Sequence, residues 1–260
     1  MLAIFCARLA LGLIASLSLL SPRQLHPRFF RTQLLTALGV LVIATLAAWP
    51  EVGPWPRGLL ATATVLSLLG ALSWTLDPAP GGRTLIVVTV AVLIAVMAFL
   101  EPPISPNTSE MTCSRWPLGS DWHWAGNGVS SALFLGSALT AMLVGHSYLI
   151  SPGMALTPLI RCLLAGGLAL VARVGVIGWG LGCWTAQNWS YNMDKEVLLE
   201  LPVRWLVGVL APLIFGLMAY SAARIRSTQS ATGILYVVVV CAFLGELLGL
   251  LLTHQTGLPL

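Results

Sequence analysis

Charged residues are scarce in this chain of 260 residues, and the motifs of soluble catalysis are missing. Only 8% of the residues are charged and 57% are hydrophobic, with a mean hydropathy of +0.90. Soluble domains carry roughly 25% charged residues, so a soluble globular class is excluded. No H-E-x-x-H zinc motif, G-x-S-x-G elbow or glycine-rich phosphate loop occurs. We therefore assign no catalytic residue and infer an integral membrane protein surrounded by the lipid bilayer.

Five cysteines are present, but none has the spacing of a metal ligand. No C-x-x-C pair or C…H pattern occurs, so no metal site is predicted. Cys6, Cys162 and Cys241 lie in or beside apolar segments, where cysteine behaves as a small apolar residue. Cys113 and Cys183 fall on the predicted outer side, and a disulfide between them is the candidate crosslink if that face is periplasmic.

Apolar runs fill most of the chain, and a helix needs about 20 such residues to cross a bilayer. The first run lacks the basic start and the A-x-A site of a cleaved signal peptide, so it is read as a retained span. The fold class predicted is all-α integral membrane with eight transmembrane helices. The segments lie near 1–21, 34–49, 57–76, 84–100, 127–149, 159–183, 203–223 and 232–253.

The basic residues are distributed unevenly between the two sets of predicted loops. The odd-numbered loops hold Arg23, Arg28, Arg31, Arg83, Arg161, Arg224 and Arg226. The even-numbered loops hold Arg57, Arg115, Lys195 and Arg204, together with most of the acids. The positive-inside rule then places the odd loops in the cytoplasm and both termini outside, in a bacterial inner membrane. The net charge of +4 mostly reflects this basic rim and indicates no nucleic-acid partner.

The two halves of the chain match each other at a shift of 130 residues. Ser21-Pro22 aligns with Ser151-Pro152, and Arg31 aligns with Arg161. In each half a span ends, the motif makes a turn and the next span begins.

This match predicts two four-helix repeats, 1–126 and 127–260. An even number of spans in each half makes the repeats parallel, related by an axis along the membrane normal.

The turn of the second half carries polar residues that the first half lacks. His146 and Tyr148 align with serines at positions 16 and 18, which favours a single site in the second half. A histidine, a tyrosine hydroxyl and Arg161 beside an apolar slot suit the carbonyls of a quinone or the headgroup of a lipid. The alternative is that His146 and Tyr148 cap backbone carbonyls or reach to the interface.

Haem is disfavoured as a cofactor. A bis-histidine haem needs two histidines at one depth on facing helices. His146 and His254 lie at opposite ends of their predicted spans, and the other pairings include a loop residue.

Arg173 and Glu246 are ionisable residues deep inside predicted spans, at equal depth from the cytoplasmic face. A buried charge needs a partner, so an intramembrane ion pair is predicted. Arg8 reaches a similar depth and could compete for Glu246. The pair could clamp helices together, relay protons or ions, or leave one charge facing a cavity.

Nine of the ten tryptophans fall on the predicted outer half, although aromatic belts normally occupy both interfaces. They form either a one-sided belt or a platform on which protein subunits dock. The nine are Trp49, Trp55, Trp116, Trp122, Trp124, Trp179, Trp184, Trp189 and Trp205.

Two turns, "GHSYLISPGMALTPLIR" and "SPRQLHPRFFR", resemble an uncharacterised bacterial family of polytopic membrane proteins with a G-H-x-Y-L, proline and arginine signature. Position 147 is serine where that family carries an aromatic residue. The resemblance implies that such a protein accompanies respiratory complexes.

The function predicted from these features is a non-catalytic membrane-anchor subunit of a respiratory electron-transfer complex. It would bind quinone or lipid near the cytoplasmic end of the fifth span. One alternative is a secondary transporter that uses the Arg173–Glu246 pair, and another is a scaffold without a ligand.

Overall fold

The computed structural model describes residues 1–260 except 51, 77–78, 101–119, 151–152, 189–194 and 257–260. It describes the backbone but not the side chains of 120–124, 183–188, 195–199 and 255–256. All regular structure in the described part is helical, as the sequence predicts. The elements are α1 (Leu2–Ser18), α2 (Pro27–Ala48), α3 (Pro54–Ser73), α4 (Gly82–Leu100), α5 (Ser120–Ile150), α6 (Thr157–Asn188), α7 (Lys195–Trp205), the π-helical turn η2 (Leu206–Leu210), α8 (Ala211–Arg224) and α9 (Thr228–Thr256).

Seven of the described helical segments are long and apolar enough to cross a membrane. Helix α7, η2 and α8 follow one another without a break and make one of these segments, Glu200–Arg224. Helix α1 has only 17 residues, or about 26 Å at 1.5 Å per residue, slightly less than the roughly 30 Å of a hydrocarbon core. The prediction of a polytopic helical membrane protein is confirmed, with α1 shorter than the expected span.

Local sequence explains several helix starts. The Nδ1 atom of His26 accepts a hydrogen bond from the Arg28 amide at 3.2 Å, and Pro27 opens α2. Pro54 opens α3 after Gly53, and the ring of proline presets the helical φ angle at this position. Gly81 has a φ of 68°, a left-handed conformation that glycine adopts without strain, and α4 follows directly.

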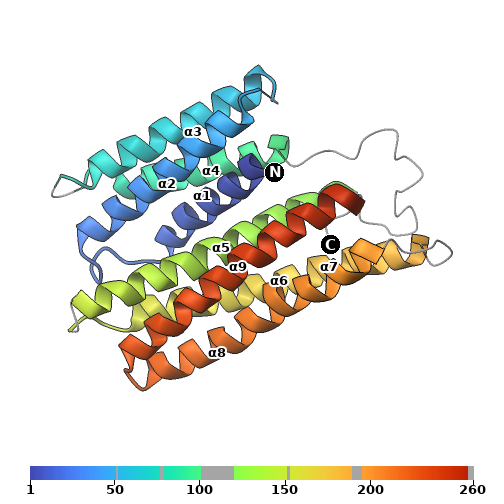
Figure 1. Ribbon diagram of the computed structural model, residues 1–260. Helices are drawn as coiled ribbons and strands as arrows, with labels where there is room; N and C mark the ends of the chain where they lie inside the picture. The colour runs from blue at the N-terminus through green and yellow to red at the C-terminus, as the bar shows by residue number, and fades with distance from the viewer. Residues whose placement is uncertain (51, 77–78, 101–119, 151–152, 189–194, 257–260) are drawn as a thin grey trace.

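The helices form two four-helix groups that lie side by side (Figure 1). In the first group α1 packs on α2 and α4, and α3 completes the ring by packing on the same two helices. In the second group α5 packs on α6 and α9, while α8 packs on α9 and only lightly on α6. The N-terminal end of α1 and the C-terminal end of α9 lie at the same end of the molecule (Figure 1), which we call the terminal end.

The two groups meet where α1 crosses α5. A methyl group added to Gly12 would overlap the carbonyl of Ala132, and one added to Gly136 would overlap the backbone of Gly12. One turn further on, the hydroxyls of Ser16 and Thr140 are 2.5 Å apart. Small residues at four-residue spacing let helix backbones approach closely in a membrane, where the packing of close surfaces drives association.

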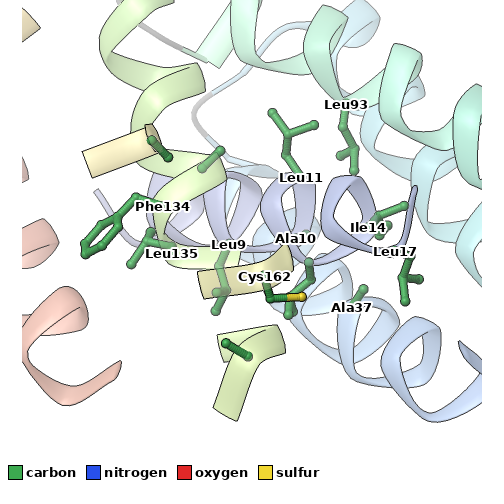
Figure 2. Close-up of a cluster of buried hydrophobic side chains, with 14 of the residues drawn as sticks. Leu9, Ala10, Leu11, Ile14, Leu17, Ala37, Leu93, Phe134, Leu135 and Cys162 are labelled. Carbon is green, nitrogen blue, oxygen red and sulfur yellow. The ribbon is translucent and has the colours of Figure 1, made fainter. Parts of the chain in front are cut away.

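Helices α1 and α5 form the interior of the assembly. Most of α1 is buried, and 78% of the α5 membrane window is buried, against 28–44% for the other candidate spans. Figure 2 shows the α1 side chains Leu9, Leu11, Ile14 and Leu17 surrounded by residues of the neighbouring helices. The amide of Gln33 on α2 also donates to the Thr140 hydroxyl at 2.7 Å, so the polar groups at this crossing satisfy one another.

Candidate functional site

A buried carboxylate on α9 binds two guanidinium groups from different helices. The Oε1 atom of Glu246 accepts from Arg8 Nη1 at 2.5 Å, and its Oε2 atom accepts from Arg173 Nη2. All three side chains are at most 4% exposed. The hydroxyl-bearing side chain of Ser131 on α5 lies beside the same carboxylate. Four helices, α1, α5, α6 and α9, therefore converge on Glu246.

The structure thus brings Arg173 and Glu246 together, as their equal depth predicted. Arg8 does not displace Arg173, because each arginine binds its own oxygen of the same carboxylate. Arg173 lies sixteen residues after the start of α6 at Thr157, or about 24 Å along the helix. The contact is therefore well inside the membrane-spanning part and nearer to the terminal end.

A third arginine, Arg204, joins this cluster, although its position in the sequence predicts an outer loop. Its side chain is 3% exposed and lies inside the span Glu200–Arg224. It is close enough to Arg8, Arg173 and Glu246 to interact with them electrostatically. We call Arg8, Arg173, Arg204 and Glu246 the arginine centre.

Two glycines of α9 contact the Arg204 side chain, one through its carbonyl and the other by leaving space for the guanidinium. Its Nη1 atom donates to the carbonyl of Gly245 at 3.1 Å, and a methyl group on Gly249 would overlap its guanidinium. The Arg204 Nε atom is buried and has no hydrogen-bond partner in the described part of the chain. The segment "GELLG", Gly245 to Gly249, therefore supplies both the carboxylate and the space for an arginine on another helix.

The helix that carries Arg204 is irregular immediately after it. Residues Leu206–Leu210 form a π-helical turn, with the Ala211 amide donating to the Leu206 carbonyl. Pro202 and Pro212 flank this turn. Within it, a methyl group on Gly208 would lie 2.9 Å from Gly245 Cα, so the two helices touch through backbone. π-turns inside α-helices occur frequently at functional sites.

The arginine centre holds more positive than negative charge. Three guanidiniums face one carboxylate, and arginine stays protonated in proteins. Glu200, four residues before Arg204 on α7, has a buried Oε2 atom without a hydrogen-bond partner in the described chain. Among these five described side chains, the three guanidiniums outnumber the two carboxylates. Guanidinium groups bind anionic groups through charge-assisted hydrogen bonds, so the buried Nε atom of Arg204 is a donor that suits a negatively charged ligand.

The polar turn of the second half has a different geometry from the predicted site. Tyr148 is 1% exposed, and its hydroxyl donates to the carbonyl of Ala155 in the following turn. His146 and Arg161 are exposed. Each residue turns the side-chain direction by about 100° around the helix axis, so residues two apart differ by about 200°. His146 and Tyr148 therefore point to nearly opposite sides of α5. The structure does not bring these two side chains together.

Several other predicted features fall wholly or partly outside the described residues. This applies to Cys113, to the Cys183 side chain, and hence to their predicted disulfide. It also applies to the side chains of five outer tryptophans, Trp116, Trp122, Trp124, Trp184 and Trp189. Of the remaining outer tryptophans, Trp49 and Trp55 are exposed, which fits an interfacial position.

No group of three or more His, Cys, Asp or Glu side chains arranged to hold a metal ion occurs within the described residues. Comparisons of the chain with protein-family models, with curated proteins and with solved structures find no match. The resemblance of the two turns to a bacterial membrane family therefore stays an expectation.

Proposed function

We propose that this membrane protein is a secondary transporter that binds an anion at the arginine centre. The observation that carries the proposal is a carboxylate bound by two buried guanidiniums, with the third buried guanidinium, that of Arg204, hydrogen-bonded to the neighbouring Gly245 carbonyl inside the membrane-spanning part. Ionisable residues at this depth are rare and usually serve substrate or ion pathways. An anion beside Arg204 would accept a hydrogen bond from its buried Nε atom.

The helix that carries Arg204 supports transport over a purely structural clamp. Transporter sites are typically formed by interrupted helices near the middle of the membrane. Here a π-turn between two prolines follows Arg204 directly, and it rests on α9 through the Gly208–Gly245 contact. This contact brings the irregular turn directly against the α9 segment that carries Glu246.

The chemistry of the arginines narrows the substrate class. Guanidinium groups bind carboxylates and phosphates through paired, planar hydrogen bonds. We expect a small carboxylate or phosphate-bearing anion. In this scheme Glu246 holds Arg8 and Arg173 in place, and Arg204 provides the open donor.

The order of helix contacts supports the predicted duplication. Helices α1, α2, α3 and α4 correspond to α5, α6, the α7–α8 span and α9, and the pairs of neighbours agree between the halves. In this proposal the two repeats are parallel, α1 and α5 lie next to the pseudo-twofold axis, and both termini face the outside. The repeats were predicted to join between residues 126 and 127. Because helix α5 begins at Ser120, the junction between the two repeats would lie earlier in the chain.

Transport is tested with purified protein in liposomes. Radiolabelled succinate, phosphate and chloride are supplied separately under an imposed pH or sodium gradient. We expect uptake of one of the first two. Arg204→Gln should lower its apparent affinity about ten- to hundredfold, because a hydrogen bond to a charged group is lost. Arg57→Gln is the matched control, since Arg57 lies near the start of α3, the helix that corresponds to the α7–α8 span, but its guanidinium lies against the Trp49 ring.

Two results would count against the proposal. One is absence of gradient-driven uptake for all three anions in liposomes that contain folded protein. The other is an equal loss of anion affinity in Arg204→Gln and Arg57→Gln. That result would show that losing an arginine from either position lowers uptake, so that Arg204 has no special role.

The respiratory-anchor prediction stays open to its own test in the same preparation. A haem band in the visible spectrum, extractable quinone or a co-purifying redox subunit would favour it. A His146→Ala variant that keeps its quinone content would remove the turn from consideration as the quinone site.

A further inference from the structure

A lateral groove separates α6 from α8 in the half of the molecule opposite the terminal end. It has a volume of about 370 Å³ and an almost wholly apolar lining drawn from α5, α6, α8 and α9. The leucines along its two rims, Leu164, Leu168, Leu213 and Leu217, are all exposed. Since these helices are candidate membrane spans, the groove opens toward the hydrocarbon of the bilayer.

Glycines hold the groove open. Gly167 on α6 and Gly216 on α8 both line it, and a methyl group added to either would meet nothing within 4 Å. The lining residues of α6 extend from Cys162 to Leu170, which corresponds to about 12 Å along the helix. The groove therefore has the shape of a slot that runs along the helices.

The corresponding position in the first half is filled. Leu34 on α2 aligns with Leu164 on α6 at the shift of 130 residues. Leu34 is 1% exposed, and a methyl group on Gly70 of α3 would lie 3.2 Å from its Cδ1 atom. Ser67 also donates to the Leu34 carbonyl at 2.9 Å and joins α2 to α3. Leu164 is 53% exposed, so at this aligned position the second half is open where the first half is closed.

Positive charge and an aromatic ring lie at the end of the groove away from the arginine centre. Tyr220 lines the groove, and the guanidinium of Arg224 lies 6.0 Å from the centroid of its ring. Arg161 directly precedes Cys162, another lining residue, on α6. Arg161 and Arg224 are both exposed, and both lie at the predicted cytoplasmic rim.

We propose that this groove binds a phospholipid with an anionic headgroup. One acyl chain lies in the slot between α6 and α8, and the phosphate lies at Arg161 and Arg224. The charge complementarity is direct, because basic pockets between membrane helices on the cytoplasmic side bind anionic headgroups. The acyl chain completes the packing of two helices that otherwise touch only lightly. This site does not depend on the proposed transport at the arginine centre.

The test measures lipid retention by native mass spectrometry of the intact, detergent-purified protein. The probes are phosphatidylglycerol and phosphatidylcholine with identical acyl chains, added at equal concentrations. We expect phosphatidylglycerol to be retained preferentially. Arg161→Gln/Arg224→Gln should reduce that preference by about fivefold for each arginine. The control is Arg31→Gln/Arg83→Gln, which removes the same charge from exposed positions of the first half.

A second variant addresses the slot itself. Gly216→Leu places a side chain in the groove and should reduce retention of both lipids, whereas Gly216→Ala should retain them. Equal retention of the two lipids by the wild-type protein would overturn the proposal. So would unchanged phosphatidylglycerol preference in the Arg161/Arg224 variant, or release of a bound quinone in place of phospholipid. Circular dichroism of every variant checks that the helices are intact.

Discussion

Replacing Glu246 by glutamine is the most informative single perturbation of the arginine centre. The change keeps the shape of the side chain and removes its negative charge. Arg8 and Arg173 would both lose their ion pair with the carboxylate, and three guanidiniums would remain without a counter-charge among these four residues. Removing one partner of a buried ion pair costs about 3–5 kcal/mol. We place Glu246→Gln in this range, because two guanidiniums share the carboxylate.

Arg8→Gln should behave differently, although it breaks the 2.5 Å contact with the same carboxylate. It leaves Glu246 paired with Arg173 and reduces the excess positive charge of the centre. The lost hydrogen bond to a charged group is worth about 1.5–3 kcal/mol, and relief of repulsion offsets part of it. We therefore expect Arg8→Gln to destabilise the protein clearly less than Glu246→Gln.

The free energy of unfolding can be measured by titrating sodium dodecyl sulfate into detergent micelles and following tryptophan fluorescence and helicity. The double variant Glu246→Gln/Arg8→Gln completes a double-mutant cycle. It should be more stable than Glu246→Gln alone, because one of the three neighbouring guanidiniums is gone and their mutual repulsion falls. A loss for Arg8→Gln equal to or larger than that for Glu246→Gln would refute the reasoning from charge balance.

Three further predictions concern packing and are checked in the same unfolding assay. Gly12→Val should lower the free energy of unfolding by about 3 kcal/mol or more, because the new side chain overlaps the α5 backbone where the two groups meet. Retention of wild-type stability would contradict the close crossing of α1 and α5. Thr140→Val should cost about 1–3 kcal/mol, because it leaves the buried amide of Gln33 without its acceptor; an unchanged midpoint would argue against this bond. Tyr148→Phe should cost about 0.5–1.5 kcal/mol through the lost bond to the Ala155 carbonyl, and loss of bound quinone with unchanged stability would instead assign the tyrosine to a ligand.

The sequence predicted the helical membrane class correctly because hydropathy alone decides it. In a bilayer every backbone polar group must be satisfied internally, so long apolar runs become helices. The equal depth of Arg173 and Glu246 also followed from counting residues from the starts of their spans. Span ends were less predictable, and α5 and α6 extend beyond the apolar segments into polar sequence.

The role of Arg204 could not be read from the hydropathy pattern. It lies near the polar end of its segment, so counting residues assigned it to a loop. Two features of the sequence hint at an unusual site. One is the pair of prolines, Pro202 and Pro212, within one apolar segment, and the other is the glycine pair of "GELLG" on α9. Neither identifies a partner, because a glycine that makes room for an arginine resembles any other small residue in a membrane helix.

By itself, the amino-acid sequence determined that this protein is a helical membrane protein, where the middles of its spans lie, and that Arg173 and Glu246 lie deep inside them. These properties follow from local composition and from the fixed rise of a helix. Only the tertiary structure decided that α1 and α5 cross through Gly12 and Gly136, and that Arg204 binds the Gly245 carbonyl beside Glu246. It also decided that the α6–α8 groove is open where α2 and α3 are closed. Such contacts depend on which helix faces lie together, and residues of similar hydropathy do not encode that choice locally.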